Sequence, residues 1–337
     1  MMGLQIGDIV TRHNLRFEDL KGKTIAVDAF NAIYQFLSSI RQPDGTPLMD
    51  NKGRVTSHLS GLFYRNISLL SEGIKLIYVF DGEYHSLKGR TQENRGEVKR
   101  EANEKYKKAK EEDDVEAMGK YARMMSRIDE EMIKESKDLL EAMGIAVVQA
   151  PGEGEMQCSQ LVKDGEAWAV ASQDYDALVV GGERLIQNLT LARKRKTVSG
   201  VVDISPEIIS YKDVLNELGI DADGFISLAI LVGTDFNPKG VPGIGPKKAL
   251  TLVRQKKYPV EVFREVEHKI DFNWQEVFEI FKKPNVTKDA KVKFGKLDAS
   301  RIKEILVSEH DFSMERVEKQ LGKLKEGRGK ASQQKLF

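Results

Sequence analysis

Cysteine is nearly absent from this chain, since Cys158 is the single one among 337 residues. One cysteine excludes an intrachain disulfide framework and a zinc site built from several cysteines, and it favours a reducing intracellular compartment. No apolar run approaches the roughly 18 residues of a membrane-spanning helix, so we expect no membrane contact. The first residues also lack a basic stretch followed by an apolar one, so we expect no secretory signal.

A strong excess of either charge is also lacking, because 53 Lys and Arg residues face 52 Asp and Glu residues and leave a net charge of +1. The overall balance therefore neither favours nor excludes a nucleic-acid partner. The distribution is uneven, since residues 88–110 carry nine basic residues against four glutamates. Basic stretches beside an acidic pocket are compatible with binding of a polyanion. The 40% hydrophobic content supports one large α/β domain or two ordinary ones.

Two acidic pairs with i,i+2 spacing lie in residues 150–182: Glu153 with Glu155, and Asp174 with Asp176. In an extended or loop segment this spacing points both side chains the same way, whereas a helix would separate them. We therefore expect both pairs at strand ends and turns, facing a common point. Clustered carboxylates repel one another unless a proton or a cation intervenes, and hard oxygen ligands favour Mg²⁺ or Mn²⁺.

Three further acids, Asp28, Asp81 and Asp235, each end an apolar segment, and two more apolar segments lead into the acidic pairs. Open α/β sheets place their active sites at the carboxyl ends of the strands. Asp also caps helices, but seven acids at the ends of five apolar segments favour a metal site. The apolar runs predict strands over residues 24–28, 74–81, 144–150 and 167–174.

A charged stretch without proline, residues 93–143, predicts two or three long helices. Because it follows the segment that ends in Asp81, it is placed to overhang the acidic site, although an ordinary solvated helix face is the alternative. Residues 241–250, VPGIGPKKAL, predict a helix-hairpin-helix whose second helix turns its N-terminus and two lysines toward a phosphate. A plain glycine turn between packed helices is the alternative there, and the missing Lys-Ser/Thr excludes a P-loop.

Together these motifs resemble the flap endonucleases, the structure-specific 5′ nucleases of replication and repair, in their compact archaeal type. The resemblance covers essentially the whole chain and rests on IAVDAFNAIYQFL, SHLSGLFYR, YVFDG, APGEGEMQC, SQDYDALVVG and LVGTDFNPKGVPGIGPKKAL. It implies an α/β fold with a mostly parallel central sheet flanked by helices. It also implies a helical arch over the active site, near residues 84–130, and a DNA-binding helix-hairpin-helix.

The resemblance also implies two Mg²⁺ ions, for which Mn²⁺ is able to substitute. One ion is assigned to four of the acids: Asp28, Asp81, Glu153 and Glu155. The other is assigned to the remaining three: Asp174, Asp176 and Asp235. Two such ions would activate a water and stabilise the leaving 3′ oxygen, which yields a 5′-phosphate without a covalent protein intermediate. We expect no catalytic role for His58 or His85.

Three further residues match catalytic positions of the family. Lys88 and Arg95 lie seven apart, which places them on one face if both belong to one helix, and two cations there would flank the scissile phosphate. Tyr34 matches an aromatic residue on which a nucleobase stacks. The ordinary alternatives are exposed basic residues and a buried core tyrosine.

The DNA contacts implied by the resemblance lie in two regions. Arg41 and Arg65 match family contacts, and Thr56 with Ser57 matches the segment that receives a one-nucleotide 3′ flap. The second region is the glycine hairpin, which holds downstream duplex with a monovalent cation at its turn, and it comprises Gly233, Gly243, Gly245, Lys247 and Lys248.

We expect a monomer with a single nuclease domain over residues 1–325. Its parts are an N-terminal nuclease region, an internal nuclease region and a C-terminal helical region, covering residues 1–99, 117–259 and 260–325. Residues 326–337 are expected to form a flexible tail that binds the sliding clamp through Gln333, Leu336 and Phe337. The second aromatic of the family motif is missing there, which leaves a shortened tail or a weakened clamp contact as interpretations.

The expected activity is structure-specific 5′ flap endonuclease with 5′–3′ exonuclease activity, in Okazaki-fragment processing and base excision repair. The expected location is cytoplasmic and nucleoid-associated. A bubble- or junction-cutting relative is an alternative within the family. A metal-dependent phosphatase is a rival from another class, since it would share the acids but not need the basic arch, and a catalytically silent DNA-structure binder is a third.

Overall fold

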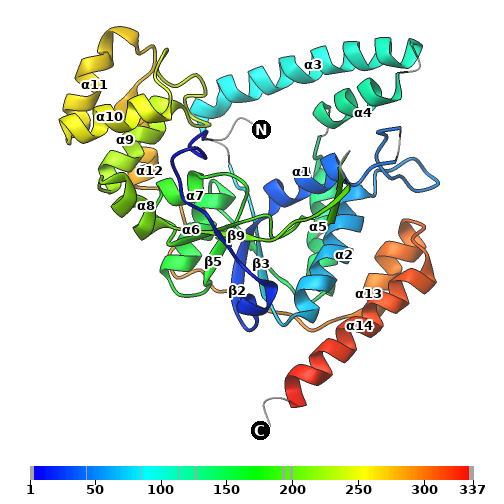
Figure 1. Ribbon diagram of the computed structural model, residues 1–337. Helices are drawn as coiled ribbons and strands as arrows, with labels where there is room; N and C mark the ends of the chain where they lie inside the picture. Colours follow the sequence, from blue (N-terminus) through cyan, green and yellow to red (C-terminus); the bar gives the residue numbers. More distant parts are fainter. Residues whose placement is uncertain are drawn as a thin grey trace.

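A seven-stranded sheet forms the centre of this computed structural model, which describes residues 4–42, 44–83, 85–112, 114–125, 127–191, 194–197 and 200–333 (Figure 1). The strand order is β1-β9-β6-β5-β2-β3-β4. Strands β2 to β6 run parallel, and β9 and β1 add an antiparallel edge. The strands are β1 (His13–Asn14), β2 (Thr24–Asp28), β3 (Lys75–Phe80), β4 (Ala146–Gln149), β5 (Ala169–Ala171), β6 (Arg184–Gln187) and β9 (Glu207–Ser210).

The central strands are mainly apolar because both faces of the sheet are covered. Along β3, Leu76, Tyr78 and Phe80 point into one core while Ile77 and Val79 point into the other. This two-residue alternation is the normal geometry of a strand. The predicted mostly parallel sheet flanked by helices is therefore confirmed.

Helices cover the sheet in two layers, each with its own buried core. One layer contains α1 (Ala29–Ser39), α2 (Ser57–Ser71), α5 (Glu130–Ala142), α13 (Ala299–Lys303), the π-helical turn η4 (Glu304–Glu309) and α14 (Met314–Gln333). The other contains α6 (Gly154–Lys163), α7 (Asp176–Val179), α8 (Tyr211–Leu218), α9 (Ala222–Val232), α10 (Pro246–Lys256), α11 (Pro259–Val266) and α12 (Trp274–Lys282).

The charged stretch forms two helices that pack on each other, α3 (Gly89–Glu111) and α4 (Val115–Met124). In Figure 1, α3 extends across the top of the molecule, above the carboxyl ends of the parallel strands, and α4 folds back beneath it. The contact with the body is close at Gly45, where an added Cβ would lie 2.3 Å from the Gly119 Cα of α4. The predicted helical overhang is thus present.

Smaller elements complete the chain. Residues 194–203 form a hairpin of two strands, β7 (Lys194–Thr197) and β8 (Gly200–Asp203). Short helical turns occur at η1 (Phe17–Leu20), η2 (Ser86–Lys88) and η3 (Glu267–Lys269). In the part of the chain that the structure describes, no helix combines the length and apolarity needed to cross a membrane.

The apolar run before Asp235 forms helix α9, so this acid follows a helix and not a strand. One element differs from expectation. Helix α14 continues to Gln333, where composition predicts a flexible tail from residue 326 onward. An alternating polar composition with few turn residues is compatible with a solvated helix as well as with disorder, so composition alone does not separate the two.

Candidate active site

Asp28 and Asp81 lie at the carboxyl ends of the adjacent parallel strands β2 and β3. Asp28 is the last residue of β2 and the N-cap of α1, and its Oδ1 accepts the Asn31 amide at 3.0 Å. Asp81 directly follows β3, and its Oδ1 accepts the Gly154 amide at 2.8 Å. Strand pairing alone therefore brings these two acids together.

Glu153 and Glu155 enter the same pocket from the start of α6. Glu153 is the N-cap, with extended backbone angles of φ −72° and ψ 128°, and Glu155 lies in the first helical turn. The expectation that both occupy an extended or loop segment is therefore wrong for Glu155. The change from extended to helical backbone between them lets both enter the site, and the Glu155 Oε1 accepts the Ala177 amide at 3.1 Å.

The second pair shows the same arrangement, because Asp176 is the first residue of α7 and not part of an extended segment. The Asp174 Oδ2 accepts a hydrogen bond from the Asn31 side chain at 2.9 Å. Between the two acids, the Tyr175 hydroxyl lies 2.5 Å from a guanidinium nitrogen of Arg12. This contact ties the loop to the N-terminal segment.

Lys88 is a buried cation among these acids. Its Nζ lies 2.5 Å from the Glu153 Oε2, 3.4 Å from the Asp235 Oδ2 and 5.2 Å from the centre of the Phe236 ring. The lysine ends η2, immediately before α3, so the arch delivers it to the pocket. Burial would lower the pKa of Lys88, but Glu153 and Asp235 raise it, so the ammonium stays charged.

The carboxylates perturb one another strongly. Burial, reinforced by repulsion from Asp81, raises the pKa of Asp28 well above its usual value. Burial and Glu153 raise the pKa of Asp81 to about 6. Burial and Asp235 raise the pKa of Asp176 to about 8. Buried acids that disfavour their own charge in one cleft are typical of a site that takes up a cation or a proton.

The donor set fits a hard divalent cation, although the acids do not form a finished coordination shell. Among the described residues, no three or more His, Cys, Asp or Glu side chains stand in the arrangement of a metal site. Most of the acids contact a protein donor instead. Two buried oxygens, the Glu153 Oε1 and the Asp176 Oδ1, nevertheless have no hydrogen-bond partner. Since buried polar atoms are normally satisfied, these two mark where a cation fits.

The two remaining catalytic candidates are Tyr34 and Arg95. Tyr34 on α1 is 39% exposed, so it is not the core tyrosine that the alternative supposed. Arg95 lies within α3, one element after Lys88, and its side chain is outside the described residues.

The candidates near the start of α2 are more enclosed. Thr56 and Ser57 are buried, and the Ser57 hydroxyl donates to the Ile40 carbonyl at 2.7 Å while accepting the Leu48 amide at 2.9 Å. The Ser57 hydroxyl thus connects the backbone at Ile40 to the backbone at Leu48. The Arg41 side chain donates to the Leu37 carbonyl at 2.7 Å, and burial lowers the pKa of Arg65.

The glycine hairpin connects α9 to α10. Gly233 is the C-cap of α9, with φ +115°, and an added Cβ would lie 2.9 Å from the Gly240 amide nitrogen, so a side chain would not fit. Gly243 also has a positive φ, and Gly245 is the N-cap of α10, which begins with Pro246. The first turn of α10 carries both lysines, Lys247 and Lys248. This geometry agrees with the predicted helix-hairpin-helix.

Sequence reasoning missed three site residues. Asn31 connects Asp28 to Asp174, because its backbone amide donates to Asp28 and its side chain donates to Asp174. Gly154 is needed because an added Cβ would lie 2.6 Å from the Asp81 Oδ1. Phe236 lies beside the Lys88 ammonium. Each of the three lies within three residues of one of the acids in the sequence, and this proximity is the signal that could have identified them.

The tail residues are only partly described. Gln333 ends α14, its side chain is outside the described residues, and Leu336 and Phe337 lie outside them altogether.

Comparison with known proteins agrees with this arrangement. Residues 4–102 match the XPG N-terminal domain, and residues 144–235 match the XPG I-region. Flap endonuclease 1 of Pyrococcus furiosus is 49% identical over 326 residues, covering 96% of this chain and 95% of that protein. The corresponding protein of Thermococcus onnurineus is 48% identical with the same coverage of both chains.

Solved structures give the same result. Flap endonuclease-1 from Methanococcus jannaschii superposes with a TM-score of 0.77 at 42% identity, over 98% of this chain and 100% of that one. The catalytic core of Rad2 in complex with DNA substrate has a TM-score of 0.70 at 23% identity, over 95% and 99%, which shows a shared fold. With these matches over nearly its full length, the chain belongs to the flap endonuclease family of XPG-type nucleases.

Proposed function

We propose that this chain is a structure-specific 5′ flap endonuclease with 5′–3′ exonuclease activity. It hydrolyses the phosphodiester where a single-stranded 5′ flap meets duplex DNA, in Okazaki-fragment processing and base excision repair. The observation that carries the proposal is the cluster of mutually perturbing acids, in which a buried lysine contacts Glu153 and Asp235 and two carboxylate oxygens lack protein partners. The matched relatives are nucleases, which supports the same conclusion.

The acids would hold two Mg²⁺ ions per chain, with Mn²⁺ able to substitute. One ion would be held by Asp28, Asp81, Glu153 and Glu155. The other would be held by Asp174, Asp176 and Asp235. When bound, such ions supply Lewis-acid activation of water and stabilisation of the leaving oxygen.

The chain's own residues would position the DNA at this pocket. Lys88 holds a positive charge at the edge of the acids, where it can donate to a phosphate oxygen and stabilise charge that develops there. The exposed ring of Tyr34 offers a surface on which a base next to the scissile bond stacks. Arg95, further along α3, would contact the same phosphate. The basic helix α3 would face the single-stranded flap, for which a positive groove gives sequence-independent affinity.

More distant contacts would fix the duplex. The N-terminus of α10 with Lys247 and Lys248 would grip downstream backbone, with a monovalent cation at Gly243 and Gly245. Arg41, Arg65, Thr56 and Ser57 would contribute on the opposite side of the site. We further propose a monomer whose regions, residues 1–99, 117–259 and 260–325, act as one nuclease domain. The end of the chain would contact the sliding clamp, through Gln333, Leu336 and Phe337.

The test of the proposal compares Asp176→Ala with the parent chain on a labelled double-flap substrate with Mg²⁺. We expect cleavage to fall by several orders of magnitude while flap binding is largely kept, because Asp176 lies inside the pocket and away from the duplex contacts. Asp8→Asn, at an exposed position, is the matched control. Equal cleavage by Asp176→Ala would contradict the metal assignment, and hydrolysis of only a small phosphomonoester would favour the phosphatase.

A second test addresses Lys88→Ala. Because Lys88 is buried beside Glu153 and Asp235, we expect the single-turnover rate to fall about 100-fold, the range for loss of one charge-stabilising donor, with affinity for the flap nearly unchanged. Collapse of binding in place of rate would make Lys88 a docking residue.

A further inference from the structure

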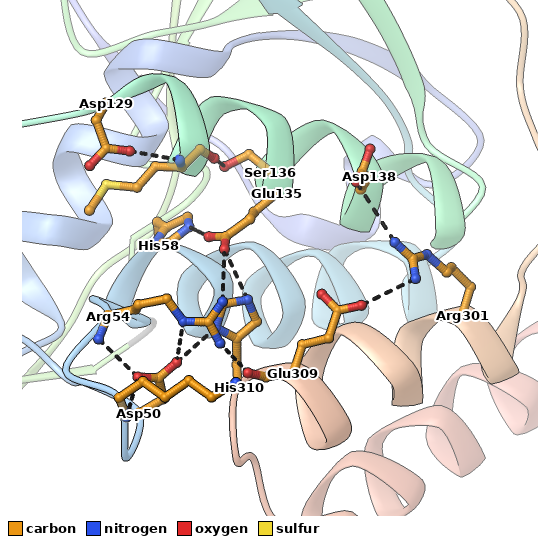
Figure 2. A network of polar contacts seen from close by, with 12 residues as sticks. Asp50, Arg54, His58, Asp129, Glu135, Ser136, Asp138, Arg301, Glu309 and His310 are labelled. Carbon is orange, nitrogen blue, oxygen red and sulfur yellow. Dashed lines mark hydrogen bonds and ion pairs between the residues drawn. The ribbon is translucent and has the colours of Figure 1, made fainter.

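A second polar network of buried side chains is drawn in Figure 2. It joins three segments that are far apart in the chain: residues 50–58 at the start of α2, Glu135 on α5, and His310 just after η4. None of these groups belongs to the acid pocket. The network therefore has a separate role.

Two histidines share one carboxylate in this network. The His58 Nε2 lies 3.2 Å from the Glu135 Oε2, and the His310 Nε2 lies 3.0 Å from the Glu135 Oε1. The other His310 nitrogen, Nδ1, lies 3.3 Å from the Asp50 Oδ2. Both imidazole side chains are fully buried. His310 is thus enclosed between two carboxylates, one from each neighbouring segment.

Arg54 completes the inner part of the network. Its Nε donates to the Asp50 Oδ2 at 2.8 Å, and its guanidinium also donates to the Glu309 carbonyl. Its NH1 lies 4.0 Å from the Glu135 Oε1. The Asp50 carboxylate further accepts the amides of Lys52 and Arg54. Asp50 is therefore held by its own turn before His310 approaches.

The charges count against two neutral imidazoles. Asp50 and Glu135 carry two negative charges and Arg54 one positive charge, so neutral histidines would leave one uncompensated negative charge in a buried cluster. Burying an uncompensated charge is costly, and a single imidazolium removes it. The His58 Nδ1 is buried without a hydrogen-bond partner. Both nitrogens of His310 face carboxylates, and its Glu135 contact is an ion pair without aligned hydrogen-bond geometry.

Other charged groups lie at the periphery, where one arginine contacts three acids. Arg301 contacts Glu304 at 2.8 Å, Glu309 at 3.3 Å and Asp138 at 3.8 Å. The Asp311 carboxylate accepts the Asn51 amide at 2.9 Å. These contacts are more exposed than the inner cluster, so they are screened by solvent and contribute less.

We propose that protonated His310, held between Asp50 and Glu135, is a proton-dependent tie that docks the C-terminal helical segment, residues 298–324, onto the start of α2. The docked segment is η4 together with α13 and α14, and α14 packs along α2. Because Thr56 and Ser57 lie between Arg54 and His58, the tie also positions that turn for DNA. This last consequence rests on the proposed nuclease function.

The direction of the pH dependence follows from the surroundings of His310. Burial would lower its pKa, but Glu135 and Asp50 raise it above the ordinary value. Burial alone would raise the pKa of Glu135, but its contacts with His310 and His58 lower it to about 2. A histidine with a raised pKa stabilises the fold fully below its unfolded pKa, and the contribution is lost as the pH rises through the folded value. The tie therefore weakens on the alkaline side.

Hydrogen exchange read out by mass spectrometry, corrected for intrinsic rates, tests the tie without any DNA. In the parent chain, protection of residues 298–324 is expected to fall about tenfold between pH 6.5 and pH 9. His310→Gln, which keeps size and polarity but not the charge, is expected to show low protection at both pH values. His268→Gln, an exposed histidine on η3, is the matched control and should behave like the parent. Protection that is independent of pH in the parent, or an unchanged pH response in His310→Gln, would overturn the proposal.

Two further measurements keep the proposal testable if His310→Gln does not fold. NMR titration of the parent should give His310 a pKa above the ordinary value of about 6.5, and a lower value overturns the tie. Glu135→Gln should lower that pKa and weaken the protection.

On a double-flap substrate, His310→Gln should raise KM several-fold with kcat nearly unchanged, since the acid pocket is untouched. If the exchange experiment gives the expected result but KM is unchanged, the proton-dependent contact of His310 is supported and its effect on DNA binding is rejected.

Discussion

At the scale of single residues, Gly154 shows how tightly the acids are held. It begins α6, donates its amide to Asp81, and would place an added Cβ 2.6 Å from the Asp81 Oδ1 and 3.0 Å from the Val79 carbonyl oxygen. Backbone and a buried carboxylate have little freedom to move away. The glycine is therefore required by the approach of α6 to β3.

Gly154→Ala is expected to destabilise the fold by about 1–3 kcal/mol, the usual cost of overpacking a buried site. It should also lower the cleavage rate, because the displaced carboxylate is one of the acids of the pocket. Chemical denaturation and a flap-cleavage assay measure the two effects. Gly322→Ala in α14, where no atom lies within 4 Å of the added Cβ, is the control and should be neutral or slightly stabilising. Equal stabilities of the two variants would contradict the close approach.

Asp176 gives the acid pocket a pH signature. Its folded pKa of about 8 exceeds the unfolded value of about 3.9, so the folded chain binds the extra proton between these pH values. Stability of the metal-free protein should therefore decrease as the pH rises from about 4 to 8. Asp176→Asn is expected to be more stable than the parent at pH 8 by about 1–2 kcal/mol, with a smaller difference at pH 5.

Urea denaturation in the presence of a chelator measures this effect. Asp8→Asn, which changes an exposed acid, should show no such gain at pH 8. If Asp176→Asn were less stable than the parent at pH 8, the Asp176 carboxylate would be charged and stabilised in the metal-free fold. The inferred repulsion among the acids would then be contradicted.

At the scale of elements, the arch approaches the body closely at Gly45. Gly45, at φ +82°, meets Gly119 of α4 so closely that a Cβ would lie 2.3 Å from its Cα. Gly45→Ala would have to push α4 away or distort the loop. We expect faster hydrogen exchange in residues 115–124, by about tenfold, because α4 loses its support.

A matched control separates this contact from the cost of backbone conformation. Gly22 has nearly the same positive φ, +78°, and open space around an added Cβ. Both alanine variants bear the strain of a left-handed residue, about 1–2 kcal/mol, but only Gly45→Ala also clashes with α4. Similar hydrogen exchange of α4 in both variants would show that the loop containing Gly45 adjusts to the added Cβ. The arch would then not depend on the contact between Gly45 and Gly119.

The elements also show how far sequence reasoning reaches. The strand carrying Asp28 was predictable to the residue, because a buried parallel strand is a continuous apolar run. The helical backbone at Glu155 and Asp176 was not, since i,i+2 spacing does not reveal where a helix begins. The Lys88 contact with Glu153 and Asp235, and the Glu135 network with two histidines, join residues more than 60 positions apart. No local pattern encodes such pairs, and only the topology of the sheet brings them together.

At the scale of the whole molecule, each of the two cores draws on all three expected regions. One core contains Leu4, Cys158 and Phe281, and the other contains Ile25, Leu139 and Leu306. Neither layer is complete without the C-terminal helices. The structure thus favours one cooperative unit over separable N-terminal, internal and C-terminal domains.

The two tryptophans of the chain test this cooperativity, because one packs against each core: Trp168 against the core with Leu139, and Trp274 against the core with Phe281. Trp274→Phe leaves Trp168 as the reporter of one core, and Trp168→Phe leaves Trp274 as the reporter of the other. For each variant, the denaturation curves from fluorescence and circular dichroism should coincide. The two cores share one sheet, so we expect neither core to unfold while the other stays folded. An earlier transition seen by Trp274 alone would show that the α9–α12 layer unfolds as a separate domain.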